Sequence, residues 1–252
     1  MGKQPTGQVI PFEALCEGYG MAVGNASGLL TSSLQVMDHP SVCLALAELG
    51  QEELGKSLSI LAAIALPPAP TAWSWFWSGW QNHLLKAHRA FLYELISPVR
   101  LESVGLDGTR LDGGSLRAKL PAEKEAGLYV SYDSSKRRFV TPADTVESVE
   151  AYHRALTLFY LALTARAVLT ALDSREDHRW YQRFAGVAFR ICSEQLYQQN
   201  MPGVLADFAA RSDDHARLIE TLNSCLEQGR SQVSALVEGS RRLAESRNAR
   251  DA

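Results

Sequence analysis

Residues 45–56 read Ala-Leu-Ala-Glu-Leu-Gly-Gln-Glu-Glu-Leu-Gly-Lys, a helical stretch with a charge where a core residue is expected. On a wheel at about 100° per residue with Leu46 as the origin, Leu49 falls on the same apolar stripe and Glu53 lies about 20° from the origin. Lys56 flanks the stripe at about 80°. A buried carboxylate is costly unless it is paired or protonated, so the stretch predicts either a packing contact or a functional site.

The composition is that of a soluble globular protein, with 46% apolar and 21% charged residues in a chain of 252. The net charge of −3 gives no general attraction to nucleic acid, so any RNA contact requires a local basic patch. The four cysteines (Cys16, Cys43, Cys192 and Cys225) form no CxxC pair or Cys/His cluster. We therefore expect reduced thiols in a cytoplasmic protein, with no metal and no cofactor.

Neither of two apolar runs is expected to cross a membrane. Residues 57–66 are too short for a span, and the run 155–172 is interrupted by Arg166 and by threonines. The first residues also lack the apolar segment of a secretion signal. We therefore expect a cytoplasmic protein without a membrane contact.

Turn, capping and periodicity signals predict a mainly α-helical bundle with a small β-hairpin insertion and extra C-terminal helices. These signals divide the chain into a helical domain, residues 1–173, and a C-terminal helical extension packed on it, residues 174–252. In the first domain we expect a loop at 99–127, a hairpin at 128–140, and helices at 12–30, 40–66, 71–98 and 141–173.

Two of the predicted helices have an unusual composition. The third carries five aromatic residues within eight positions, and most of them follow the helical period, which indicates core packing rather than a platform for bases. Trp75 points away from that stripe, so we expect it at the surface or in an interface. The first helix is lined by glycines that would allow a close helix–helix contact (Gly18, Gly20, Gly24 and Gly28).

The short connection at Pro67–Pro70 predicts that the second and third helices pack antiparallel. Glu53 lies 14 residues before Pro67 and His83 lies 13 residues after Pro70, so at about 1.5 Å per residue the two are nearly level. We therefore expect a Glu53–His83 contact with Lys56 nearby. Such a group either fixes helix register or forms an acid/base or phosphate site. Glu52 and Lys56 form only an ordinary i,i+4 pair.

Four elements in order resemble the AbiV family of bacterial abortive-infection proteins, which belongs to the HEPN-type helical domains. They are Glu52-Glu53-Leu54-Gly55-Lys56, a Trp/Phe-rich helix with His83-Leu84-Leu85-Lys86, Gly127-Leu128-Tyr129-Val130, and Phe139-Val140-Thr141-Pro142 before a long helix. The similarity covers roughly residues 12–172 and includes no motif in residues 174–252.

The resemblance implies an antiphage effector that blocks translation on infection. It also implies a phage-encoded trigger protein and self-association, which we expect as a dimer, with RNA or the translation machinery as the target. The ribonuclease motif common in HEPN-type domains, Arg followed by four to six residues and His, is absent at all six histidines. If RNA is cut, the family pattern implies Glu53, Lys56, His83 and Lys86 as the catalytic residues.

Two further readings come from different classes of protein. The chain is alternatively a non-catalytic helical interaction module whose Glu–His–Lys group only fixes the fold, so the sequence leaves open whether it is an enzyme. A di-metal carboxylate bundle needs paired Glu-x-x-His motifs, and Glu150-Ala-Tyr-His153 supplies only one. His88 and Arg89, beside the predicted site, are expected on a solvated helix face or in a basic patch.

Overall fold

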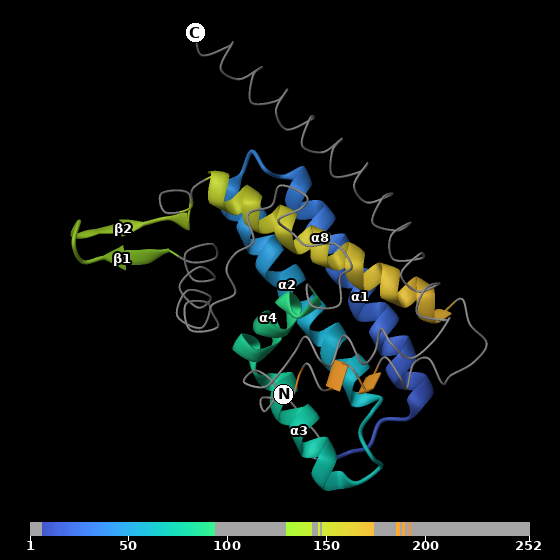
Figure 1. Ribbon diagram of the computed structural model, residues 1–252. Helices are drawn as coiled ribbons and strands as arrows, with labels where there is room; N and C mark the ends of the chain where they lie inside the picture. Colours follow the sequence, from blue (N-terminus) through green and yellow to red (C-terminus); the bar gives the residue numbers. More distant parts are fainter. Residues whose placement is uncertain are drawn as a thin grey trace, which may run out of the picture.

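The computed structural model describes residues 7–93, 130–142, 146 and 148–173, together with positions 185, 186, 188, 189 and 192 (Figure 1). The predicted loop at 99–127 lies outside the described residues. The predicted C-terminal extension at 174–252 also lies outside them, apart from those five positions. The division of the chain at residue 173 therefore stays a prediction.

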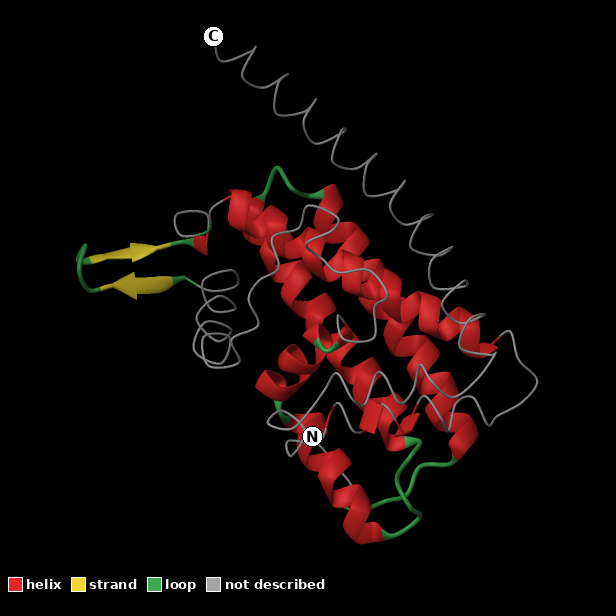
Figure 2. Ribbon diagram, in the orientation of Figure 1, coloured by secondary structure: helices red, strands yellow, loops and turns green. Residues whose placement is uncertain are grey.

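The described body is a helical bundle, as predicted (Figure 2). Three long helices form its centre: α1 (Phe12–Gln35), α2 (Pro40–Ala63) and α8 (Ser148–Asp173). Two short helices, α3 (Pro70–Gln81) and α4 (His83–Phe91), follow α2 and return along it. In the part of the chain that the structure describes, no helix combines the length and apolar character that a membrane span needs.

Helix α2 is the central element, and α1, α4 and α8 all pack against it. Pro40 occupies its first turn, as the sequence predicts. Because three neighbours cover the helix, its buried surface is wide and its exposed stripe is narrow. Apolar residues occupy that stripe, where Val42 is 47% and Leu49 is 41% exposed. The predicted core stripe through Leu49 and Glu53 is therefore wrong.

The helix predicted at 71–98 is broken at Asn82 into α3 and α4. Asn82 ends α3 and caps α4, because its side chain accepts a hydrogen bond of 3.0 Å from the backbone N–H of Leu85. Trp73 and Phe76 are buried in the core, as expected. Trp75 is partly buried and packs against the core, with its ring 5.3 Å from that of Phe189, and its expected surface or interface role stays a prediction.

The predicted hairpin is present and extends from the side of the helical body (Figure 1). Strand β1 (Ser131–Asp133) pairs antiparallel with β2 (Arg138–Val140) in the register Ser131–Val140 and Asp133–Arg138. Val140 is buried at the base of the hairpin, whereas Phe139 is 74% exposed. Beyond it, the carbonyl of Pro142 accepts a hydrogen bond of 3.1 Å from Val146, which continues the chain toward α8.

Close helix contacts occur at glycines of α2 rather than at those of α1. A methyl group added at Gly50 would lie 2.6 Å from the side chain of Leu30 on α1. By contrast, no atom of the described chain lies within 4 Å of a methyl group placed at Gly24 or Gly28. Gly18 and Gly20 face Ile60 and Leu169 at ordinary contact distance, whereas Gly24 and Gly28 meet no described residue, so the close helix–helix contact predicted for them stays a prediction.

Candidate functional site

The site is positioned by an unusually close approach of α4 to α2. A methyl group at Gly55 would lie only 1.7 Å from the backbone oxygen of Lys86, so no residue larger than glycine fits there. Glu52 lies one helical turn before Gly55 and therefore on the same side of α2. Within the Glu-Glu-Leu-Gly-Lys element, the glycine creates the contact with α4 and the first glutamate faces it.

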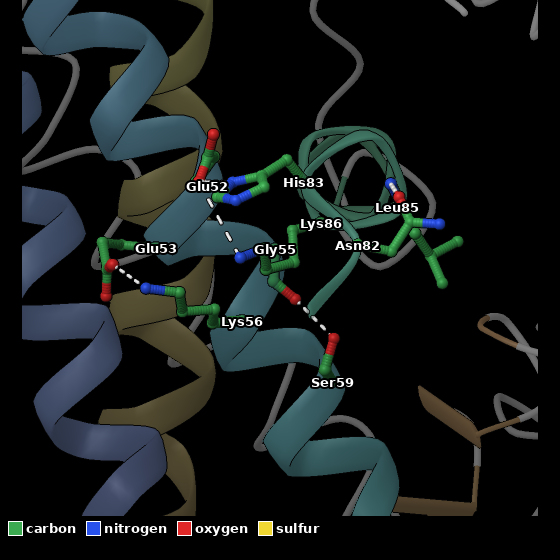
Figure 3. A network of polar contacts seen from close by, with 9 residues as sticks. All are labelled: Glu52, Glu53, Gly55, Lys56, Ser59, Asn82, His83, Leu85 and Lys86. Atoms are coloured by element: carbon green, nitrogen blue, oxygen red, sulfur yellow. Dashed lines mark hydrogen bonds and ion pairs between the residues drawn. The ribbon is translucent and has the colours of Figure 1, made fainter. Parts of the chain in front are cut away.

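Glu52 meets His83 and Lys86 across this contact (Figure 3). Its Oε2 atom lies 2.7 Å from His83 Nδ1 and 3.8 Å from Lys86 Nζ. The Glu52 side chain is 12% exposed and that of Lys86 is 5% exposed, whereas the imidazole is 65% exposed. A sheltered carboxylate and ammonium thus lie beneath a solvent-facing imidazole.

The predicted Glu53–His83 contact is wrong by one residue. Neighbouring residues on a helix point about 100° apart, and the side of α2 that meets α4 carries Glu52. Glu53 points elsewhere and forms an ion pair with Lys56 (Figure 3). The sequence signal for Glu52 was its three-residue spacing to Gly55, which places both on the side of the helix that approaches α4.

In the Glu52–His83 contact, the imidazole uses Nδ1 to bind the carboxylate, so Nε2 is the ring nitrogen that can take part in proton transfer. With Nδ1 held by the carboxylate, Nε2 has no hydrogen-bond partner among the described residues. A carboxylate on one nitrogen fixes the orientation of the ring. The exposed imidazole can therefore accept or donate a proton at Nε2 while the carboxylate behind it stays in place.

The other predicted site residues have different surroundings. Lys86 is 4% exposed, so its ammonium compensates the charge of Glu52 and does not face solvent. Lys56 lies one turn after Glu52 on α2, with its side chain 24% exposed and its ammonium 5.9 Å from the centre of the Trp80 ring. Glu53 is 20% exposed and serves as the partner of Lys56.

A second polar cluster lies one helical turn before the site and is sheltered throughout. Arg154 of α8 reaches Glu48 Oε1 at 3.3 Å and Gln51 Oε1 at 3.0 Å. Gln51 in turn donates a hydrogen bond of 2.7 Å to the carbonyl of Ala87 on α4. The cluster thereby ties α8 to α2 and α2 to α4. The sequence analysis missed it because residues more than 100 positions apart form the Arg154 contacts.

The family model of AbiV proteins, a branch of the HEPN-type domains, matches residues 14–158, which is more than half of the chain. The chain belongs to the AbiV family. No curated protein and no solved structure matched it. Family membership indicates a role in abortive infection, a form of antiviral defence, and the matched residues include both polar clusters and the hairpin.

In this AbiV-family protein Arg89 is a core residue, so its expected place in a solvated face or basic patch is wrong. Arg89 is 1% exposed and donates a hydrogen bond of 2.9 Å from Nη1 to the Ser59 hydroxyl. Its guanidinium lies 4.7 Å from the centre of the Trp75 ring, a cation–π contact that also explains why that tryptophan packs inward. The side chain stabilises the α3–α4 region from within.

Two of the buried cysteines of this AbiV-family chain are poor nucleophiles. Burial raises the pKa of the Cys43 and Cys192 thiols to about 11, so both are protonated at neutral pH. Within the described ranges no group of three or more His, Cys, Asp or Glu side chains could hold a metal ion. Within the Glu52–His83–Lys86 cluster, the exposed imidazole of His83 is the group best placed for proton transfer.

Proposed function

We propose that the protein is an abortive-infection effector that blocks translation on phage infection by cleaving RNA at the Glu52–His83 site. A single observation carries the proposal: an imidazole that is 65% exposed is held through Nδ1 by a carboxylate that is 12% exposed. An ordinary surface histidine does not need a sheltered charge behind it. Family membership supports the defence role, and a phage-encoded protein is the proposed trigger.

In the proposed reaction His83 Nε2 takes the proton of a ribose 2′-hydroxyl. The oxygen then attacks the adjacent phosphorus and the bond to the 5′ oxygen breaks. The departing 5′ oxygen takes a proton from a solvent water, and the His83 imidazolium returns its proton to solvent. The products are a 2′,3′-cyclic phosphate and a 5′-hydroxyl end. Glu52 stabilises the imidazolium, and Lys56 stabilises charge on the phosphate. Lys86 compensates Glu52 from the buried side.

The test combines a translation assay with analysis of RNA ends. Purified protein is added to a cell-free translation system with and without phage lysate, and total RNA from the same reactions is sequenced from its 5′-hydroxyl ends. Arrest with new 5′-hydroxyl ends in the presence of lysate supports the proposal. His83→Gln keeps a hydrogen-bonding group beside Glu52 but cannot transfer a proton, so it should fold and fail to arrest translation.

The second candidate function is a non-catalytic interaction module, and the burial of Lys86 favours it. An ammonium that is 5% exposed beside a sheltered carboxylate is the arrangement of a packing contact. On this reading the protein arrests translation by binding a component of the machinery. Arrest by wild type and by His83→Gln alike, without new RNA ends, would support this function and exclude the catalytic one. The proposed dimer is tested by sedimentation of the same preparations.

A further inference from the structure

We propose that the β1–β2 hairpin is an RNA-binding arm that takes single-stranded RNA, with its cations on the phosphates and Phe139 against a base. The proposal rests on the proposed function, because it names the element that would deliver RNA to the protein. It concerns a surface far in sequence from His83. Its support comes from the exposure, charge and backbone geometry of the hairpin.

The hairpin projects from the helical body (Figure 1), and its residues combine positive charge with an exposed aromatic ring. Residues 134–139 are all exposed, and they include Lys136, Arg137 and Arg138 in succession, followed by Phe139 at 74% exposure. Between 131 and 140 the one acidic residue is Asp133, so three cations minus one carboxylate leave a charge of +2. The whole chain carries −3, so this segment has the opposite sign to the molecule that bears it.

The backbone of Arg137 adds an independent observation. Its φ angle is +52°, and it is the one non-glycine residue with positive φ among the described residues. Glycine and asparagine adopt this conformation at lower energy, and it is the usual place for them in a hairpin turn. An arginine held there is unfavourable for the turn itself, and such outliers cluster at functional sites.

A flexible polyanion with unstacked bases fits these features best. Arginine and lysine on an extended arm can follow a phosphate backbone, and an exposed aromatic ring stacks on a base that is not paired. A duplex offers phosphates but no free base face, so it would use the cations and not Phe139. An acidic protein surface would likewise leave the ring without a specific role.

The test measures binding of a short fluorescent single-stranded RNA of mixed sequence to the full chain, with the matching duplex as a second probe. Three variants are compared with wild type: Arg137→Asn, Phe139→Ala, and the combination Lys136→Ser, Arg137→Asn and Arg138→Ser. The combined variant should make the salt dependence shallower by about 2, since each lost phosphate contact on a single strand removes about 0.7 from the slope. Phe139→Ala should weaken single-strand binding about fivefold or more and leave duplex binding unchanged.

Arg137→Asn is the most informative single variant. It removes one positive charge and places asparagine at a positive φ angle, which asparagine adopts more readily than arginine. It should fold at least as well as wild type and still weaken single-strand binding. The matched control is Arg166→Gln, which removes one charge from an exposed position of α8 distant from the hairpin in sequence and should bind as wild type does. Equal RNA affinity of wild type and all hairpin variants would overturn the proposal.

The binding assay contains no ribosomes and scores no cleavage, so it separates this proposal from the proposed function. Wild-type protein that binds single-stranded RNA through the hairpin but leaves translation running would support the RNA-binding arm and contradict the effector function. Arrest of translation with new 5′-hydroxyl RNA ends, together with hairpin variants that bind single-stranded RNA as wild type does, would do the reverse.

Discussion

The two polar clusters of α2 contain similar side chains and lie one helical turn apart, but they differ in how far their members are exposed to solvent. The Glu48–Gln51–Arg154 cluster joins three helices, and its ion pair is 10% and 5% exposed. The Glu52–His83–Lys86 cluster joins two helices and ends in an imidazole that is 65% exposed. Both satisfy a sheltered carboxylate, but only the second presents a titratable group to solvent. Exposure of one member, rather than burial of the carboxylate, therefore distinguishes a candidate site from a packing contact.

The largest expected effect tests the enclosed cluster. Arg154→Leu leaves Glu48 sheltered without its ion-pair partner on α8, and removing one member of a buried pair costs about 3–5 kcal/mol. We expect a loss of that size in the free energy of unfolding, measured by urea denaturation. Arg166→Leu on the same helix is the control, because Arg166 is exposed and should change stability by less than about 0.5 kcal/mol. Equal stability of the two variants would show that the enclosed cluster contributes nothing.

The next effect tests the contact that both clusters share. Gly55→Ala places a methyl group 1.7 Å from the Lys86 carbonyl, so α4 must shift away from α2. We expect a destabilisation of about 3 kcal/mol, at the upper end of what overpacking usually costs. Gly24→Ala on α1 is the control, since the added methyl group meets no described atom and should stabilise the helix by about 0.5–1 kcal/mol. Wild-type stability of Gly55→Ala would contradict the close approach of the two helices.

Most of the fold follows from local signals, which explains what the sequence predicted correctly. Proline at the start of α2 and the turn between the two short strands are each encoded within a few residues. The face of α2 that meets α4 is not encoded locally. It depends on three neighbours covering the helix, and this coverage leaves apolar Leu49 exposed and sheltered Glu52 within the contact.

The break between α3 and α4 explains the rest of the difference. The prediction for residues 71–98 assumed one continuous helix, whereas the cap at Asn82 ends α3 and starts α4 at His83. The predicted Glu53–His83 contact failed for a similar reason. The sequence of α2 alone does not show which of two neighbouring glutamates points toward α4. The carboxylate, imidazole and lysine types were predicted, but the glutamate that joins them was not.

A smaller effect tests how the exposed cluster is positioned. Asn82→Ala removes the side chain that caps α4 and should cost about 1 kcal/mol. Because His83 is the first residue of α4, fraying of that turn should weaken translation arrest more than the stability loss alone explains. Asn82→Asp keeps a capping oxygen and should retain both stability and arrest, measured in parallel by thermal unfolding and the cell-free assay. Similar behaviour of the alanine and aspartate variants would exclude a positioning role for the cap.

The smallest effect on stability is expected at His83, and it decides what the comparison of the two clusters means. The imidazole is 65% exposed, so His83→Gln removes little packing and should change the free energy of unfolding by less than about 0.5 kcal/mol. Urea denaturation measures that change, and the translation assay measures arrest on the same preparation. Normal stability with lost arrest separates the two clusters by function, because Arg154→Leu should lose stability first. If His83→Gln instead destabilised the chain as much as Arg154→Leu, both clusters would be packing contacts, and the exposed nitrogen of His83 would have no part in defence.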